Sequence, residues 1–271
     1  MANPTILFLA DPHLGEDQPG HQASFEEILQ RAAPMRPQLV IVLGDVTEDG
    51  KRRESYFDDA RRQIARFNCE VVCIPGNHEE GYNVHRTTHL PPVERPFLKR
   101  FEHYFNPMPW SRQVGAVRIL GIDSQILGSG WNEERHQQAW LSEQLQSRQT
   151  KESIVVVMHT PLYLETPGPQ DDIHDYWAIP HQARTDLLAC LKQDPPEMLL
   201  AGHVHRGIAV PCEFCESRTL ASSSFQAHTM WSVKNDRLPV GEDDLCFYTM
   251  EASAASPVLQ RHVLDHQDRY R

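Results

Sequence analysis

Two histidines separated by one residue follow a short apolar run in the second half of the chain. The segment AGHVHRG comes directly after Met198–Leu200 and places His203 and His205 where a buried strand would end. Alternate residues of an extended chain face the same way, and neutral imidazole is the commonest metal ligand. The pair is therefore compatible with a bound metal ion, and equally with histidines that only satisfy hydrogen bonds.

The same arrangement follows four other apolar runs. Each run is followed at once by residues that can bind a metal or exchange a proton. These residues are Asp11 and His13 in DPHLG, Asp45 in GDVTEDG, Asn77 and His78 in PGNHEE, and His159 in HTPLY. In open α/β sheets, ligands bind beyond the carboxyl ends of the strands. We therefore expect all five segments to meet in one site.

The residue types in this set indicate a particular class of metal. Aspartate, histidine and an asparagine amide without thiolate suit borderline divalent ions such as Mn, Fe, Zn or Co, rather than a structural zinc. Apart from His78, the set holds three carboxylate or amide side chains and four imidazoles. That is too many for one catalytic ion and suits two ions that share a ligand. Paired ions about 3.5–4 Å apart polarise a phosphate, generate hydroxide and clamp an in-line displacement.

The apolar runs that would position these residues predict strands buried on both faces, because they are short, rich in β-branched residues and not strictly alternating. The runs are Ile6–Leu9, Leu39–Leu43, Val71–Ile74, Val117–Gly121, Ile154–Met158 and Met198–Leu200. Amphipathic stretches between them predict helices at Phe25–Ala33, Glu54–Phe67, Gln138–Ser147 and Gln182–Lys192. This alternation predicts an α/β fold with crossover helices.

The last quarter of the chain has a different pattern. Short apolar runs at Ile208–Val210, Thr219–Ala221, Leu245–Met250 and Val258–Leu264 are separated by turns. They predict a β-meander that completes a second sheet. Because no repeat or linker interrupts the chain, we expect one domain over residues 1–271, with a β-rich C-terminal part at 207–264.

The composition is typical of a globular protein and argues against two classes of partner. Of the 271 residues, 40% are hydrophobic and 23% are charged. The net charge of −11 disfavours a nucleic-acid surface, which needs clustered Lys and Arg. The sequence shows no signal peptide and no apolar stretch long enough to cross a membrane. We therefore expect a soluble, cytoplasmic protein with no nucleic-acid or membrane partner, and the oligomeric state stays open.

Six cysteines in a chain of this size do not predict a disulfide framework. Cys212 and Cys215 form a single C-x-x-C with no second pair to complete a zinc ribbon. A redox pair or a small zinc site is possible there. The favoured interpretation is a hairpin turn between two strands.

Taken together, the motifs resemble those of the calcineurin-like metallophosphoesterase superfamily, in its small phosphodiesterase-like or protein-phosphatase-like branch. The pattern D-x-H, G-D-x-x, G-N-H-(D/E), H, G-H-x-H is complete and in order between Ile6 and Gly207. The resemblance implies two mixed β-sheets packed as a sandwich and flanked by helices. It also implies a hydrolase that acts on a small-molecule phosphate ester. We favour a phosphodiester or nucleotide over a monoester or a phosphoprotein, because the chain is acidic and only Arg206 stands near the motifs to meet an additional negative charge.

The resemblance assigns roles to individual residues. One metal would take Asp11, His13, Asp45 and His205, and the other would take Asp45, Asn77, His159 and His203. Asp45 would bridge them, and a bridging hydroxide would attack phosphorus. His78 would protonate the leaving oxygen. Glu48 holds the position of the carboxylate that orients this histidine, where family members usually have aspartate.

Other segments carry weaker expectations. The resemblance places a capping insert around residues 164–183, where Asp172, Tyr176 and Trp177 would line the pocket mouth or belong to a packed surface loop. Arg206 would meet a phosphate oxygen or form a surface salt bridge. The loop Gly128–Arg135 and His228 are further candidates for contact with substrate. The remaining histidines are expected to be structural.

Two other classes of function belong to the same fold. A protein-binding scaffold would have lost metal ligands, and the set here is intact. A DNA-end nuclease would show a basic groove and an additional DNA-capping domain, which the acidity and short length of the chain disfavour. GDVTEDG also lacks the arginine that follows this acid in the large protein serine/threonine phosphatases.

Overall fold

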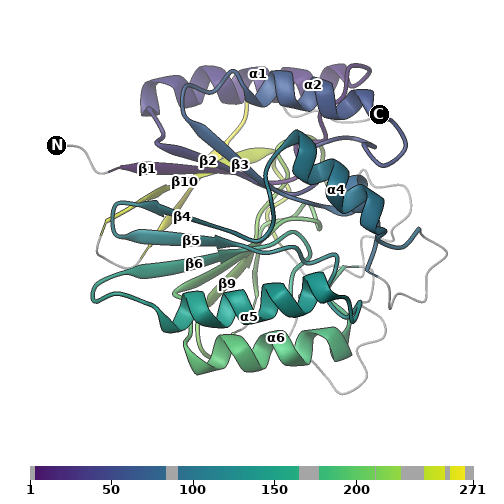
Figure 1. The fold of residues 1–271 in the computed structure, drawn as a ribbon. Coiled ribbons are helices and arrows are strands. Elements are labelled where there is room, and N and C mark those ends of the chain that lie inside the picture. The colour runs from purple at the N-terminus through teal and green to yellow at the C-terminus, as the bar shows by residue number, and fades with distance from the viewer. Residues whose placement is uncertain are drawn as a thin grey trace.

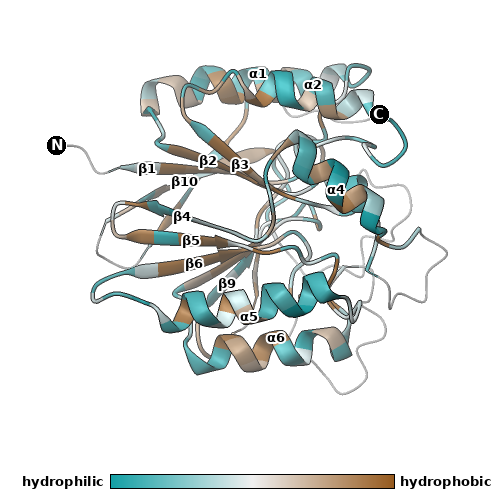
Figure 2. Cartoon of the chain, viewed as in Figure 1, coloured by the Kyte–Doolittle hydropathy of each residue, from teal (hydrophilic) through white to brown (hydrophobic). Residues whose placement is uncertain are grey.

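Two β-sheets lie between two layers of helices in the computed structural model (Figure 1). The structure describes residues 4–83, 91–164, 177–210, 212–226, 241–253 and 257–265. Figure 2 shows that the strands in the middle of the molecule are mostly hydrophobic, whereas the helices carry many hydrophilic residues. The arrangement is the predicted sandwich of two mixed sheets.

The first sheet has five strands in the order β11-β10-β1-β2-β3. They are β1 (Thr5–Leu9), β2 (Leu39–Leu43), β3 (Glu70–Ile74), β10 (Cys246–Glu251) and β11 (Leu259–Val263). The pairs β1–β2 and β2–β3 are parallel, with Ile6 opposite Leu39 and Leu39 opposite Glu70. The carboxyl ends of these three strands therefore meet at one edge of the sheet.

The second sheet has six strands in the order β4-β5-β6-β7-β9-β8. They are β4 (Trp110–Val114), β5 (Val117–Gly121), β6 (Ser153–Val157), β7 (Met198–Ala201), β8 (Ile208–Val210) and β9 (Glu216–Thr219). The strands β5, β6, β7 and β9 run parallel to one another. The two edge strands, β4 and β8, are antiparallel to their neighbours.

Helices cover the outer faces of both sheets. The helices α1 (Pro19–Ala32) and α2 (Ser55–Ile64), with a 3-10 turn at Ala33–Met35, lie over the first sheet, and α5 (Asn132–Gln146) and α6 (His181–Gln193) lie over the second (Figure 1). Two further helices are α3 (Asn77–Glu80) and α4 (Arg95–Tyr104). Side chains of both sheets, among them Phe8 and Val155, form the layer between the sheets.

The predicted strands and helices of the first two hundred residues are confirmed, with differences of up to six residues at element ends. The sequence pattern missed α4 and β4. Only Phe101 of α4 is buried, and β4 buries only its two end residues, so neither contains a continuous apolar run like those of the predicted strands.

The expectation for the last quarter is wrong in its topology. The strands β8 and β9 complete the second sheet, but β10 and β11 join the first sheet through an antiparallel pairing of β10 with β1. The strand β9 also precedes the predicted run at Thr219–Ala221 and overlaps it only at Thr219. Local pattern shows where a strand is, whereas its partner is set by contacts between distant residues.

Among the described residues, no helix is long and apolar enough to cross a membrane.

Candidate metal centre

The seven predicted ligands lie at the carboxyl ends of five strands and are all buried. Asp11 and His13 follow β1, Asp45 follows β2, Asn77 follows β3, His159 follows β6, and His203 and His205 follow β7. The first four come from one sheet and the last three from the other. Their side chains meet where the strand ends of the two sheets converge.

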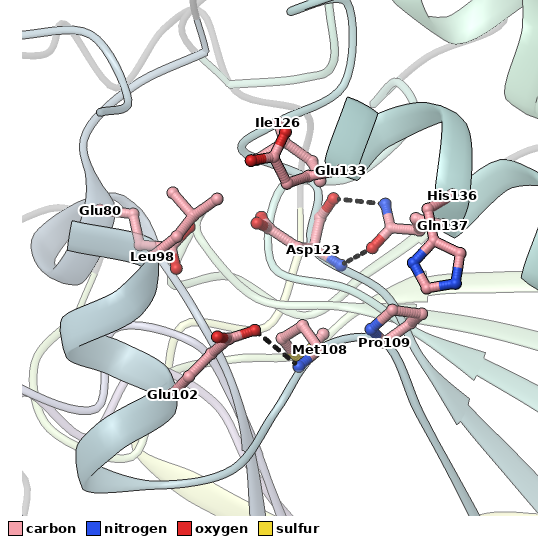
Figure 3. Close-up of a pocket in the computed structure, with 10 residues that line it drawn as sticks. All are labelled: Glu80, Leu98, Glu102, Met108, Pro109, Asp123, Ile126, Glu133, His136 and Gln137. Carbon is pink, nitrogen blue, oxygen red and sulfur yellow. Dashed lines mark hydrogen bonds between the residues drawn. The ribbon is translucent and has the colours of Figure 1, made fainter. Parts of the chain in front are cut away.

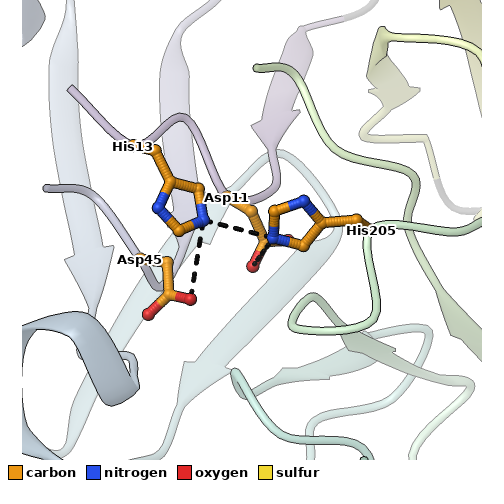
Figure 4. A group of neighbouring side chains, drawn as sticks. All are labelled: Asp11, His13, Asp45 and His205. Atoms are coloured by element: carbon orange, nitrogen blue, oxygen red, sulfur yellow. Dashed lines mark hydrogen bonds and ion pairs between the residues drawn. The ribbon is translucent and has the colours of Figure 1, made fainter. Parts of the chain in front are cut away.

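Four of these residues form one group (Figure 4). Asp11, His13, Asp45 and His205 each offer a ligand atom, and these atoms lie within 4.8 Å of one another. The Nε2 atoms of His13 and His205 are 3.1 Å apart. His205 Nε2 is 3.6 Å from Asp11 Oδ1, and His13 Nε2 is 3.7 Å from Asp45 Oδ2.

A second group shares Asp45 with the first. Asp45, His159 and His203 offer ligand atoms within 4.8 Å of one another. His159 Nε2 is 3.4 Å from Asp45 Oδ2 and 3.1 Å from Asn77 Oδ1. Asn77 therefore lies at the edge of this group, and Asp45 is the residue through which the two groups join.

The backbone at this site is held in an unusual conformation. Asp11, His13, Asp45, His203 and His205 have φ values of 48°, 44°, 44°, 70° and 53°. Non-glycine residues rarely adopt this left-handed region, and each instance costs about 1–3 kcal/mol when the surroundings impose it. Strained backbone at the candidate ligands indicates a site whose geometry is maintained against local preference.

The loops also bring backbone close to the ligands. A Cβ atom at Gly76 would lie 2.1 Å from Asp45 Oδ1, and one at Gly44, where φ is +82°, would lie 2.3 Å from His159 Nδ1. Any side chain at either position would displace a candidate ligand. The glycines of the G-D and G-N-H motifs are thus required by close approach.

Main-chain carbonyls orient two of the imidazoles. His159 Nδ1 donates to the carbonyl of Leu43 at 2.9 Å, and His205 Nδ1 donates to the carbonyl of Phe225 at 3.0 Å. With Nδ1 protonated, Nε2 of each ring carries a lone pair directed at the cluster when the ring is neutral. Hydrogen bonding of the outer nitrogen in this way is common in metal-binding histidines.

Glu48 has a different position from the expected one. Its carboxylate Oε2 lies 3.3 Å from His13 Nδ1 and 3.8 Å from His21 Nδ1. The oxygen that contacts the ring Nδ1 of His78 is the main-chain carbonyl of Glu48. The longer side chain of glutamate thus reaches His13, while backbone replaces the expected carboxylate at His78.

His78 lies at the rim of the cluster. Its backbone N–H donates to Asp45 Oδ1 at 2.9 Å, its ring Nε2 is 4.0 Å from Asp45 Oδ2, and its side chain is 31% exposed. The candidate ligands, by contrast, are all buried. His78 is therefore the histidine of the set that is most accessible to a bound molecule.

Burial and neighbouring charges shift the pKa values of five of the candidate ligands. Burial raises the pKa of Asp11 to about 8, whereas His159 and His78 hold the pKa of Asp45 well below its ordinary value despite its burial. Burial lowers the pKa of His159, but the carboxylates of Asp45 and Asp11 and the carbonyl of Leu43 together outweigh it and raise the pKa to about 9. Burial and neighbouring imidazoles lower the pKa of His13 and that of His205 well below the ordinary value.

These residues fit a pair of divalent ions. The facing Nε2 atoms of His13 and His205 present lone pairs to each other unless a proton or a cation lies between them. The donors are imidazole nitrogens and carboxylate or amide oxygens without sulfur, the set that Mn, Fe, Co and Zn accept in catalytic sites. Two groups with one shared carboxylate suit two ions better than one.

Sequence reasoning missed residues that support the ligands from behind. The ring of Phe225 packs on His205 and His13 with centroids 4.1 and 4.8 Å apart. The hydroxyls of Ser222 and Ser224 donate to the carbonyl of Asp11 at 3.0 and 2.7 Å. The contacts with His13 and Asp11 join segments about 200 residues apart, so residue spacing does not reveal them.

The structure also locates several weaker candidates. Arg206 is buried and pairs with Asp243 through an Nη2–Oδ2 contact of 3.0 Å. Trp177 is buried and packs beside His203 at 5.8 Å. Asp172, Tyr176, His228 and most of the insert at 164–183 lie outside the described residues.

Two other segments serve local structure. The pair Cys212 and Cys215 lies in the connection between the antiparallel strands β8 and β9, as predicted, with the two sulfurs 3.1 Å apart. In the loop Gly128–Arg135, the backbone N–H groups of Gly128 and Gly130 donate to the carboxylate of Glu134 at the start of α5. These contacts tie the loop to that helix.

Comparisons with known proteins agree on the family and the fold. The profile of the calcineurin-like phosphoesterase family matches residues 4–207. A protein from Arcobacter nitrofigilis named "Probable glycerophosphodiester phosphodiesterase GpdQ" is 28% identical over 63% of the chain and 58% of its own length. The serine/threonine-protein phosphatase CPPED1 of Danio rerio is 26% identical over 63% of the chain and 55% of its own length. The chain thus spans about half the length of these relatives.

Solved structures show the same fold at low sequence identity. The purple acid phosphatase PPD1 from yellow lupin superposes with a TM-score of 0.70 at 14% identity, over 97% of this chain and 52% of that one. A dimetal phosphatase from Danio rerio superposes with a TM-score of 0.67 at 14% identity, over 97% of both chains.

Proposed function

Since the chain belongs to the calcineurin-like phosphoesterase family, we propose that it is a dinuclear metal-dependent phosphoesterase. The observation that carries the proposal is the pair of buried ligand groups that share Asp45. An intact ligand set distinguishes this chain from a scaffold that has lost its metals. The predicted cytoplasmic location stays a prediction.

The donor atoms divide between two ions around the shared residue. One ion would be held by Asp11, His13, Asp45 and His205, and the other by Asp45, Asn77, His159 and His203. When bound, the ions would supply Lewis-acid polarisation of the ester and a nucleophilic water at neutral pH. The identity of the metals, among Mn, Fe and Zn, is left to measurement.

His78 is proposed as the general acid. It lies beside Asp45 without belonging to either ligand group, and its ring is partly exposed. The carbonyl of Glu48 accepts from Nδ1, which leaves Nε2 to exchange a proton with the leaving oxygen. In this role the main-chain carbonyl of Glu48 would hold the His78 ring in place, while the Glu48 carboxylate lies near His13.

The substrate class we favour is a phosphodiester of a small molecule or nucleotide. A monoester brings a second negative charge, and Arg206, which follows His205 in the sequence, is already paired with Asp243. The name of one relative, a glycerophosphodiester phosphodiesterase, supports this choice. The name of another, a serine/threonine-protein phosphatase, supports the alternative of a phosphomonoesterase or protein phosphatase.

An activity panel tests the reaction and the substrate class together. The purified chain would be assayed with Mn, Fe and Zn on bis-(p-nitrophenyl) phosphate, p-nitrophenyl phosphate and cyclic nucleotides. We expect the diester to be hydrolysed at least as well as the monoester. A tenfold or greater preference for the monoester with every metal would contradict the diester assignment, and no hydrolysis of any ester would contradict the proposed reaction.

A further inference from the structure

The hairpin formed by β8 and β9 carries two cysteines in its connection. Val210 pairs with Ser217 in antiparallel register, and the same register continued by two residues sets Cys212 opposite Cys215. Opposite residues of an antiparallel pair have Cβ atoms about 4.5–5.5 Å apart, and a disulfide needs about 3.5–4.5 Å. The strand pairing therefore brings the two thiols to within a small movement of a disulfide geometry.

The two sulfurs are in direct contact. Cys212 Sγ and Cys215 Sγ are 3.1 Å apart, and both residues are free thiols. The distance distinguishes between two uses of a cysteine pair. Two thiolates on a tetrahedral zinc, each about 2.3 Å from the ion, would lie about 3.8 Å apart. The observed separation is shorter than that and favours a pair of thiols that can join to each other.

The surroundings hold the pair from one side and leave the other side open. Both cysteines are half-buried, and Glu213 between them is exposed. Cys215 packs against the hydrophobic cluster between the second sheet and the helices α5 and α6, and the buried Tyr163 hydrogen-bonds Cys212. A small oxidant can therefore meet thiols that are already positioned, without unfolding of the hairpin.

We propose that Cys212 and Cys215 form a redox pair, which a low-molecular-weight disulfide such as oxidised glutathione converts reversibly to an intramolecular disulfide. Neither cysteine belongs to the two ligand groups of the candidate metal centre. The proposal therefore does not depend on the phosphoesterase reaction.

The conversion consists of two thiol–disulfide exchanges. The Cys212 thiolate attacks one sulfur of oxidised glutathione, which forms a mixed disulfide and releases one glutathione thiolate. The Cys215 thiol then loses its proton, and its sulfur attacks the Cys212 sulfur, which forms the intramolecular bond and releases the second glutathione. Two protein thiols are oxidised, one disulfide is reduced to two thiols, and these two thiols take up both protons.

The contact between the cysteines sets the order of the two steps. Burial raises the pKa of Cys215, and the hydrogen bond to Cys212 and the charge of Cys212 raise it further. Because only the thiolate is the nucleophile, we assign the first attack to Cys212. Once Cys212 is in the mixed disulfide, its two contributions to the pKa of Cys215 are gone. The second attack is then easier than a first attack by Cys215 would be.

Differential alkylation of the full chain in glutathione buffers tests the proposal. Trypsin cleaves after Arg206 and Arg218 and releases a peptide, residues 207–218, that contains both cysteines and none of the other four. As the ratio of oxidised to reduced glutathione rises, we expect this peptide to change in one step. It should lose both alkylation sites and become lighter by two hydrogen atoms. Excess reduced glutathione should restore the two alkylated cysteines.

Cys212→Ser and Cys190→Ser are the matched variants. Cys212→Ser should abolish the form that is lighter by two hydrogen atoms and leave at most a mixed disulfide on Cys215. Cys190 is also half-buried and packs against the same hydrophobic cluster, so Cys190→Ser should leave the midpoint of the transition unchanged.

Three results would overturn the redox pair. They are no loss of the two hydrogen atoms at any glutathione ratio, glutathione that persists on both cysteines of the unmodified chain, and a zinc ion in the purified chain that Cys212→Ser removes. The first two are measured on the unmodified chain, so they decide the matter even if a variant does not fold.

Discussion

At the scale of single residues, Asp45 is the position on which the proposed centre depends. It belongs to both ligand groups, and its Oδ1 also accepts the backbone N–H of His78. Asparagine would keep the shape but remove the charge that both ions share. We expect Asp45→Asn to lose bound metal and activity together, as measured by metal analysis and turnover of the purified variant. Two retained ions with near-normal turnover would remove Asp45 from the bridging position.

The role of His78 is separable from metal binding. General acid catalysis is worth about 10²–10⁴-fold, and it matters most for a poor leaving group. His78→Ala should therefore lose about that much on an alkyl phosphodiester and far less on a p-nitrophenyl ester, with metal content unchanged. Equal losses on both esters would indicate that His78 only positions the substrate.

Glu48 is predicted to act on His13. Its carboxylate lies 3.3 Å from His13 Nδ1, the outer nitrogen of a ring whose Nε2 faces the cluster. Partners of this kind change metal affinity by about 10–100-fold when removed. Glu48→Gln should weaken metal binding within that range, measured by competition with a chelating dye, and leave the dependence on leaving group intact. The neighbouring acid substitution Asp49→Asn is the control, and an equal loss of affinity there would contradict a specific role for Glu48.

At the scale of elements, an acid at the end of α3 meets an acid in the segment that follows β5 (Figure 3). Glu80 at the end of α3 and Asp123 just after β5 are both buried, and Glu79 and Glu102 add negative charge near Glu80. Burial raises the pKa of Asp123 from 3.8 to about 6. The contact between these elements is therefore sensitive to pH.

The sign of that dependence follows from linkage. Between about pH 4 and pH 6, folded Asp123 holds a proton that the unfolded chain has lost, so stability decreases as the pH rises through this window. Asp123→Asn removes the titration. We expect the variant to gain stability relative to the unmodified chain as the pH is raised from 4 to 7, in thermal melts at each pH.

The comparison between variant and unmodified chain cancels the titrations that both proteins share. The substitution also removes the Asp123 carboxylate that raises the pKa of Glu80, which changes the stability in the same direction. Glu133→Gln is the matched control, because Arg95 holds the pKa of this exposed acid below its ordinary value. It should show no gain with rising pH. A difference in melting temperature between Asp123→Asn and the unmodified chain that stays the same at every pH would contradict the raised pKa of Asp123.

At the scale of the whole molecule, the proposed centre joins the two sheets. Asp11, Asp45 and Asn77 follow strands of one sheet, whereas His159 and His203 follow strands of the other. Ions bound between them would connect the layers at one end of the sandwich. Without ions, only the imidazoles can offset the negative charge of the buried carboxylates.

Removal of metal should therefore lower the melting temperature. A ligand that binds only the folded state stabilises it by about 4 kcal/mol when its free concentration is 1,000 times Kd. We expect a chelator to lower Tm in calorimetry and re-addition of the ions to restore it. Asp45→Asn, already expected to lack metal, should show no response to the chelator. An unchanged Tm of the unmodified chain after verified metal loss would contradict a link between the sheets.

The sequence by itself determined the strands and the residues that follow them. Runs such as Leu39–Leu43 are apolar throughout because both faces are covered, and Asp45 follows after a single glycine, so strand and candidate ligand are read from one short segment. The order of five such segments also predicted the family and the sandwich fold. These features lie within short segments of the chain, or repeat along it, so they can be predicted without knowing which distant residues are in contact.

Only the tertiary structure decided which side chains meet across the chain. The Glu48 carboxylate lies 3.3 Å from His13 Nδ1, whereas His78 Nδ1 contacts the main-chain carbonyl of Glu48. Arg206 pairs with Asp243, 37 residues away, and Glu80 meets Asp123 from a different element. Such contacts depend on loop paths and on the direction of each side chain, which residue spacing does not specify. The same reason placed β10 and β11 in the first sheet, since the pairing of a strand depends on contacts far from it in the sequence.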